Sequence, residues 1–280
     1  MRATVVTILF FVFISPWFCN CFGQTPLSKI PAPPPGGKAF QSGEVLYYEV
    51  YYNWGLIWVD AGFVTFSVKD EVINNRTLYH FIGEGSSKRN WDWFFKVRDK
   101  YESYNDTSSL HPFKYIRNSN DGGYWVYNDI MFDFKNNRAI GKLKTKKNPT
   151  FQTDTIKISN STFDPISMIY YARTIDYEKY KPNDEIPISI ILDNEVHSVK
   201  ITFHGKETIK TGLGTFKCIK FKPTLIAGTI FKEGSAMTVW VTDDDNRIPI
   251  KVETPIITGT IKVYLKKASG FKYKVSSKVE

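Results

Sequence analysis

The chain has 280 residues and a formal net charge of +9, with 42% hydrophobic and 16% aromatic residues. Two of its three cysteines lie in an N-terminal segment typical of an export signal, which leaves Cys218 alone in the mature chain and excludes an internal disulfide. The fold must therefore be stabilised by its core, and a mature chain of about 255 residues is long enough for that.

The first residues have the features of a secretory signal peptide. A basic start precedes an apolar run, Val5–Phe18, that is too short to span a bilayer comfortably. Small residues around Gly23 predict cleavage there, so we assign residues 1–23 to the signal. Two alternatives stay open: a retained N-terminal anchor, and a lipoprotein modified at Cys19 or Cys21, although the small residues that normally precede a lipidated cysteine are absent.

Residues 24–39 are rich in proline and glycine and are predicted to form an extended tether about 40 Å long. The uniform composition of residues 40–280 indicates a single domain. Its alternating apolar and polar residues predict mostly β structure, and its short connections favour antiparallel pairing. The elements expected are strands at 44–53, 57–69, 77–85, 96–104, 112–118, 123–134, 138–145, 151–158, 186–192, 196–204, 216–223, 226–231, 236–242, 247–253 and 256–265, and a helical turn at 90–95.

A longer helix is predicted to begin at Asp164, which is followed by a proline in the first helical position, and to end at Lys181. Arg173 lies in the middle of the apolar stripe of this helix, where an unpaired charge is costly to bury. We expect a buried ion pair between Arg173 and Asp99 or Asp60. The alternatives are recognition of an anionic ligand and extension of the side chain to water.

Lysines gather near residue 145. Lys142, Lys144 and Lys146 share parity, so on a strand they would line one face, and Lys147 follows. A charged sheet edge that discourages aggregation accounts for this pattern, and attraction to anionic lipid headgroups is the alternative. Export separates the chain from nucleic acid, so we expect no nucleic-acid partner.

Residues for catalysis or for binding a metal or cofactor are not evident. The four histidines have no metal-binding spacing, and Cys218 lies in an alternating run typical of a buried strand. We therefore predict no catalytic residue, no metal and no cofactor. The acids Asp92, Asp99 and Glu102 are the first candidates if the chain is instead a polysaccharide-directed hydrolase, which needs two facing carboxylates.

Aromatic residues are the remaining signal. Tryptophans are most often part of a core, but they also line clefts that bind sugars, lipid tails or protein partners. The candidate ligand-binding residues are Trp54, Trp58, Trp91, Trp93, Trp125, Arg173 and Trp240.

Several segments together resemble a family of exported bacterial proteins known as domain of unknown function 3108, common in Bacteroidetes. They span nearly all of the mature chain in the order of the family. The matching segments are Gly43-Glu44-Val45-Leu46-Tyr47-Tyr48, Ala61-Gly62, Val97-Arg98-Asp99-Lys100-Tyr101-Glu102-Ser103, Asp164-Pro165-Ile166-Ser167, Tyr171-Ala172-Arg173, Gly214-Thr215-Phe216-Lys217-Cys218, Trp240-Val241-Thr242-Asp243-Asp244 and Arg247-Ile248-Pro249.

The resemblance implies export to the periplasm or outer envelope of a Gram-negative bacterium, but no established activity. A weaker similarity to lipoprotein-carrier half-barrels of the LolA and LolB kind implies a curved antiparallel sheet, a half-barrel or open barrel, with one or two short helices packed on or in it. The helix from Asp164 would then be a lid or plug. Fold analogy alone does not establish function.

Our leading hypothesis is non-catalytic binding of a lipid-like or amphipathic envelope molecule in the β cavity, and peripheral membrane contact is compatible with it. We expect a cavity of about 300 Å³ or more in that case. A structural module that binds an envelope protein partner predicts an exposed aromatic patch instead. The hydrolase is the third hypothesis, and it requires a cleft with two carboxylates.

Overall fold

The computed structural model describes residues 39–54, 57–224, 237–256 and 259–279. The predicted signal peptide at 1–23, the tether up to residue 38 and the strand predicted at 226–231 lie outside the described residues.

The described residues form fifteen strands, a short α-helix and three 3-10 turns. The strands are β1 Val45–Trp54, β2 Ile57–Ile73, β3 Arg76–Ser87, β4 Val97–Asp106, β5 Pro112–Asp121, β6 Tyr124–Asp133, β7 Arg138–Thr145, β8 Gln152–Lys157, β9 Thr162–Phe163, β10 Glu185–Leu192, β11 Glu195–Thr211, β12 Gly214–Pro223, β13 Thr238–Thr242, β14 Pro249–Ile256 and β15 Gly259–Ser269. The helix is α1 Pro165–Ala172, and the turns are Arg89–Trp91, Phe134–Asn136 and Tyr177–Lys179.

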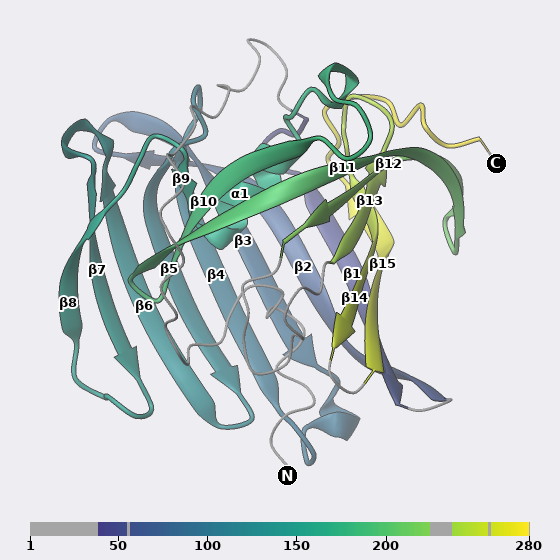
Figure 1. Ribbon diagram of the computed structural model, residues 1–280. Helices are drawn as coiled ribbons and strands as arrows, with labels where there is room; N and C mark the ends of the chain where they lie inside the picture. Colours follow the sequence, from purple (N-terminus) through teal and green to yellow (C-terminus); the bar gives the residue numbers. More distant parts are fainter. Residues whose placement is uncertain (1–38, 55–56, 225–236, 257–258, 280) are drawn as a thin grey trace.

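All fifteen strands belong to one sheet, in the order β8-β7-β6-β5-β4-β3-β2-β1-β15-β14-β13-β12-β11-β10-β9. The neighbours pair antiparallel, except that β9 pairs parallel with β10. The sheet curves strongly, so that β10 and β11 cross in front of the strands at its middle and α1 lies inside the curve (Figure 1). The architecture is the curved half-barrel that the sequence predicts.

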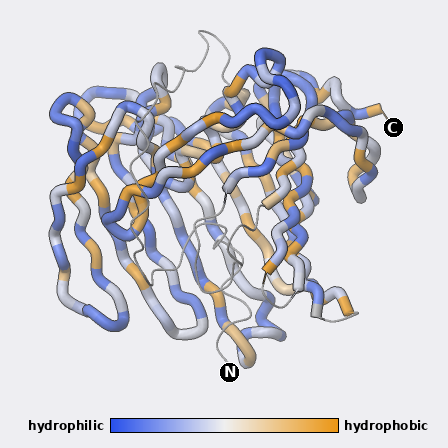
Figure 2. Tube along the Cα trace, viewed as in Figure 1, coloured by the Kyte–Doolittle hydropathy of each residue, from blue (hydrophilic) through white to orange (hydrophobic). Residues whose placement is uncertain are grey.

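The alternation of residues along each strand explains the two faces of the sheet (Figure 2). On β4, for example, Val97, Asp99, Tyr101, Ser103 and Asn105 are buried, and the residues between them are half-buried or exposed. The buried set faces the inside of the curve, where α1 covers it.

The helix begins at the predicted position but is shorter than predicted, because it ends at Ala172 and not near Lys181. Thr174 breaks the pattern: its backbone N–H and its hydroxyl both donate to the carbonyl of Tyr171, at 2.8 Å each, which is the local side-chain competition that ends helices. The short strand β9 was not predicted, since two residues carry no readable alternation.

The turn between β10 and β11 closes the half-barrel. Leu192 pairs with Glu195, so Asp193 and Asn194 form a two-residue turn, and both have positive φ angles, 47° and 63°. Asx residues tolerate this conformation, which is typical of a type I′ hairpin. The tip of the hairpin reaches across the concave face to β5, β6 and β7 on the far side of the sheet (Figure 1).

Side-chain hydrogen bonds hold the tip there. Arg117 on β5, which is fully buried, donates to the Asp193 carboxylate at 2.8 Å. Asn194 accepts from the Asn128 amide on β6 at 2.9 Å and donates to the carbonyl of Gly141 on β7 at 3.3 Å. A side chain at position 141 would collide with Asn194, since its Cβ would lie 2.1 Å from the Asn194 Oδ1. The half-barrel is therefore closed by hydrogen bonds of polar side chains and not by backbone pairing between two strands.

The substitution Asp193→Asn tests this closure, because it keeps the shape and the positive φ angle but removes the charge that pairs with Arg117. We expect the free energy of unfolding in urea to fall by about 3 kcal/mol, since a buried guanidinium is left without its ion pair. Glu185→Gln is the control: Glu185 pairs with Lys200 with both side chains about half exposed, and its loss should cost less than about 1 kcal/mol. Equal losses would contradict a closure that depends on the buried pair.

Candidate functional site

The position of α1 is set by Asp164, which caps the helix and attaches it to the sheet. Its carboxylate accepts from the backbone N–H groups of Ile166 and Ser167 at 2.9 Å each, and the Ser167 hydroxyl accepts from the Asp164 N–H, which completes a capping box. The hydroxyl of Ser103 on β4 donates to the other carboxylate oxygen at 2.5 Å. Burial raises the pKa of Asp164 to about 6, and these hydrogen bonds oppose the rise.

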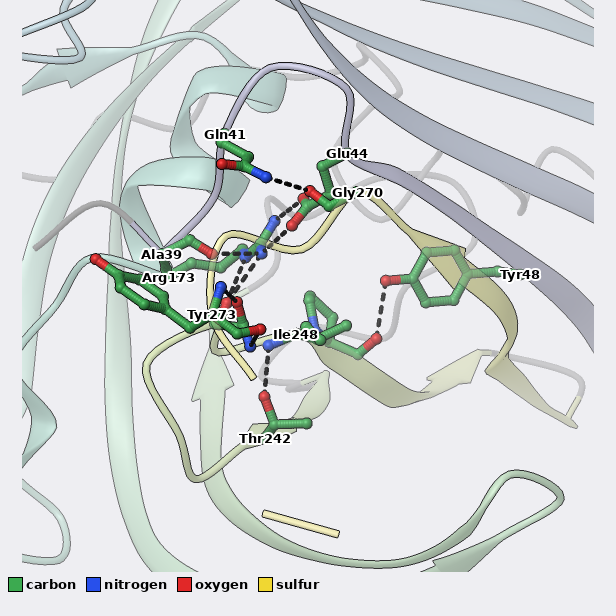
Figure 3. Close-up of polar contacts among 11 residues, drawn as sticks. Ala39, Gln41, Glu44, Tyr48, Arg173, Thr242, Ile248, Gly270 and Tyr273 are labelled. Carbon is green, nitrogen blue, oxygen red and sulfur yellow. Dashed lines mark hydrogen bonds and ion pairs between the residues drawn. The ribbon is translucent and has the colours of Figure 1, made fainter. Parts of the chain in front are cut away.

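The other end of the helix is fixed by Arg173, which is 2% exposed (Figure 3). Its guanidinium forms a two-pronged ion pair with Glu44, at 2.5 and 2.8 Å, and donates to the carbonyls of Ala39 and Asn246, at 3.0 and 2.9 Å. The predicted ion pair between Arg173 and Asp99 or Asp60 is therefore wrong: Glu44 is the partner, because the segment before β1 runs directly past the end of α1.

The Arg173 network joins segments from both ends of the chain. Asn246 in the turn between β13 and β14 exchanges two hydrogen bonds with the backbone of Tyr273, at 2.9 Å each (Figure 3). The C-terminal segment also passes Gly43 so closely at Gly270, where φ is 73°, that a Cβ would lie 2.1 Å from the Gly43 carbonyl oxygen. One buried cation thus fixes the helix, the start of the domain and its C-terminal segment together.

A cavity of about 150 Å³ lies between α1 and the inner face of the sheet. The helix contributes Ile166, Ile169 and Tyr170 to its lining, and the sheet contributes side chains from β1, β2, β4 and β11–β15, among them Val64 and Val239. Nearly all of the lining is aliphatic or aromatic. A cavity of this size and character accepts small apolar groups.

Two tyrosines on the lining differ in how their hydroxyls are used. The Tyr48 hydroxyl donates to the Pro249 carbonyl at 2.8 Å, whereas the Tyr170 hydroxyl is buried and has no hydrogen-bond partner in the part of the chain that the structure describes. Burial raises the pKa of both phenols well above the ordinary value, so both remain neutral. Tyr170 therefore offers a hydrogen bond to a polar atom that reaches the cavity.

A second, polar region lies beside the cavity on the inner face of β4–β6. Tyr101 lines the cavity, and Asp99, two residues away on the same face of β4, begins this polar region. Asp121 is its diagonal neighbour on β5. Within the described residues, one oxygen of Asp99, both oxygens of Asp121 and the Oδ1 of Asn128 are buried without a hydrogen-bond partner. Four buried acceptors without a donor are unusual in a folded interior.

The two carboxyl groups influence each other's protonation. Burial raises the pKa of Asp99 well above its ordinary value, and the neighbouring Asp121 raises it further, whereas Arg117 opposes the shift. Burial raises the pKa of Asp121 to about 7, again against the attraction of Arg117. The pair therefore retains a proton at neutral pH.

Among the predicted ligand-binding residues whose side chains the structure describes, Arg173 lines the cavity and Trp58, Trp91, Trp93, Trp125 and Trp240 do not. Trp240 is 6% exposed and faces away from the cavity, with the Lys251 Nζ 4.4 Å from its ring centroid. Trp58, Trp91, Trp93 and Trp125 lie where β1–β6 turn at one end of the sheet. Trp54 ends β1 at the same place, although its side chain lies outside the described residues. A ligand-binding role for these tryptophans stays a prediction.

The acids suggested for a hydrolase are separated from one another. Asp92 is bound to Arg98 at 2.6 Å, Asp99 is buried on the inner face of β4, and Glu102 lies on the opposite face beside Lys100. Cys218 is buried in β12, and burial raises the pKa of its thiol to about 12, far from that of a nucleophile. Within the described ranges, no three His, Cys, Asp or Glu residues form a group able to hold a metal ion, and no helix is long and apolar enough to cross a membrane.

Together these features define a class: an open antiparallel half-barrel with a capped helix inside its curve and an apolar cavity under that helix. The same fold occurs in a beta-barrel-like protein of unknown function (DUF1849) from Brucella abortus, with a TM-score of 0.56 and 10% identity over 82% of this chain and 98% of that one. A candidate lipoprotein from Parabacteroides distasonis matches at a TM-score of 0.33, with 14% identity over 83% of this chain and 99% of the other.

The chain belongs to the family of proteins of unknown function named DUF3108, whose model matches residues 47–266. This confirms the family suggested by the sequence. No curated protein matches the chain.

The substitution Glu44→Gln tests the Arg173 network, because it removes the negative charge but keeps the shape. We expect the free energy of unfolding to fall by about 3 kcal/mol, as for other buried ion pairs that lose one partner. The control is Glu49→Gln, since Glu49 pairs with Lys266 on the surface with about a third or less of each side chain exposed, and less than about 1 kcal/mol should be lost. The free energies of unfolding of both variants are measured in urea. Similar decreases in the two variants would contradict the special role of the Arg173 network.

The carboxyl pair predicts an unusual dependence of stability on pH. The folded chain keeps a proton on Asp121 up to a pH of about 7, whereas the unfolded chain releases it near its ordinary pKa of 3.8. The stabilisation from this proton is therefore present at low pH and is lost as the pH rises through this window. We expect Asp121→Asn to gain stability relative to the natural chain between pH 4 and pH 7, measured by urea unfolding; a difference that is constant with pH would contradict the raised pKa.

Proposed function

We propose that the chain is a non-catalytic binding protein of the cell envelope, which takes an apolar part of an amphipathic molecule into the cavity under α1. The observation that carries this proposal is the cavity itself, because interiors of folded proteins are close-packed and a void lined almost only by apolar side chains loses stability unless something fills it.

The size of the cavity limits the ligand. At about 150 Å³ it is half the volume expected from the sequence, so a bulky ligand is not accommodated within the described residues. Pro223 and Met237 both belong to the lining, and residues 225–236 between them lie outside the described part of the chain. A six-membered ring or a short stretch of one acyl chain is the matching class of ligand.

Polar groups beside the cavity support an amphipathic ligand over a purely apolar one. Among the described residues the Tyr170 hydroxyl and the buried oxygens of Asp99 and Asp121 have no hydrogen-bond partner, and Tyr101 lies between the cavity and these carboxyl groups. A ligand with a hydrogen-bonding head would satisfy groups that otherwise destabilise the interior. Export to the envelope, which the apolar segment Val5–Phe18 predicts, is part of the proposal and is compatible with such a ligand.

Binding of a fluorescent acyl-chain probe, displaced by dodecanol or by dodecane, tests the proposal. Val239→Phe fills the cavity and should weaken binding of the probe at least about tenfold, because the added ring takes the space of the ligand. Tyr170→Phe removes only the hydroxyl; it should weaken displacement by dodecanol about fivefold and leave displacement by dodecane unchanged.

The control is Val72→Phe, which makes the same change at a residue of β2 that is 69% exposed, and it should leave binding intact. Thermal unfolding of each variant shows that it is folded. Unchanged probe binding in a folded Val239→Phe variant would refute binding in this cavity. Native mass spectrometry of the chain from its own envelope fraction then identifies the natural ligand by its mass.

A further inference from the structure

Aromatic residues far apart in the sequence gather at one end of the sheet. In an antiparallel meander every second connection lies at the same end. The connections β1–β2, β3–β4, β5–β6 and β7–β8 therefore share one end, and they form the lower edge of the half-barrel in the view of Figure 1. We call their described residues 57–60, 88–96, 122–125 and 146–151 the aromatic rim.

The rim exposes several large apolar side chains to solvent. Trp93 is 80% exposed, Ile57 is 68% exposed and Trp58 is 44% exposed, and Phe151 on the β7–β8 connection is 52% exposed. Large apolar residues exposed together at one end of a soluble domain mark a contact surface.

The rim is also positively charged. Its exposed basic residues are Arg89, Lys96, Lys146 and Lys147. The acids of the rim are paired with other basic residues: Asp60 pairs with Lys88, and Asp92 pairs with Arg98. Exposed tryptophans among basic residues on neighbouring connections match the two layers of an anionic bilayer, with its negative headgroups above its apolar chains.

We propose that the aromatic rim docks the half-barrel on the surface of an anionic phospholipid bilayer. Trp93, Ile57 and Trp58 enter the interface between headgroups and acyl chains, and the basic residues contact the phosphates. A bilayer is favoured over a protein partner because exposed apolar side chains on three of these connections, and exposed basic residues on two of them, are spread along one edge of the sheet, whereas a protein interface is centred on one compact patch. This surface is separate from the cavity, so the inference does not depend on the proposed ligand.

Two residues at opposite ends of β2 give a matched test. Ile57 at the rim is 68% exposed and Val72 at the other end is 69% exposed, so an aspartate at either position perturbs folding similarly. The processed chain is recovered from the envelope of producing cells and sedimented with vesicles of phosphatidylethanolamine and phosphatidylglycerol, or of phosphatidylcholine alone.

The natural chain should bind the anionic vesicles, and about tenfold more weakly in 0.5 M than in 0.1 M salt, because charges at the surface are screened. Ile57→Asp and Trp93→Ala should weaken binding about tenfold, and Val72→Asp should leave it within about twofold. Hydrogen exchange of residues 88–96 should slow in the vesicle-bound chain.

Equal binding of the Ile57→Asp and Val72→Asp variants, without slower exchange at 88–96, would overturn the proposal; it is the result expected of a covalent lipid or a retained anchor acting alone. Absence of binding to anionic vesicles would overturn it too, and crosslinks from the rim to an envelope protein would then assign the surface to a protein partner. Binding that does not change with vesicle charge or with salt would exclude the proposed contact between the basic residues and anionic headgroups.

Discussion

The buried ion pair between Arg173 and Glu44 is the interaction on which the interior depends. It holds the C-terminal end of α1, anchors the segment before β1 and, through Asn246, fixes the C-terminal segment. Burying two charges is unfavourable unless every group is paired, and here the guanidinium has two carboxylate oxygens and two carbonyls. Because the helix roofs the cavity, this pair, together with the cap at Asp164, holds the roof of the cavity in place.

The half-barrel divides its interior into two environments. Under α1 the walls are apolar and enclose a small cavity, whereas β4–β6 carry charged and amide groups that meet the tip of the β10–β11 hairpin. The tip of the hairpin is held on the far side of the sheet by side-chain hydrogen bonds. The polar residues of β5 and β6 that bind it must therefore point toward the inside of the curve. Closure by polar contacts thus explains why Arg117 and Asn128 are buried on a face that the helix otherwise makes apolar.

The sequence predicts the strands and the start of α1 because both signals are local: alternation of apolar residues, and an Asp-Pro pair at a helix N-terminus. The partner of Arg173 could not be found in this way, since Glu44 is 129 residues distant and only the closed fold brings it near. The alternation of residues along β4 is enough to place Asp99 on the inner face. That Asp121 is its neighbour can be known only from the register in which β4 pairs with β5. The aromatic rim could have been predicted from the sequence. In an antiparallel meander alternate connections lie at the same end of the sheet, so the order of the predicted strands is enough to bring their tryptophans together.

Several features that depart from the rules of stable folding lie together inside the curve. They are the apolar cavity, the Tyr170 hydroxyl, which has no hydrogen-bond partner among the described residues, and the carboxyl pair of Asp99 and Asp121, and each lowers the stability of the folded state. The outer face, in contrast, pairs its charges: Glu49 with Lys266, and Glu253 with two lysines. Local departures of this kind concentrate at functional sites, because selection for stability alone would fill the cavity and replace the acids. The inside of the half-barrel is therefore where a function acting on a small molecule must be sought.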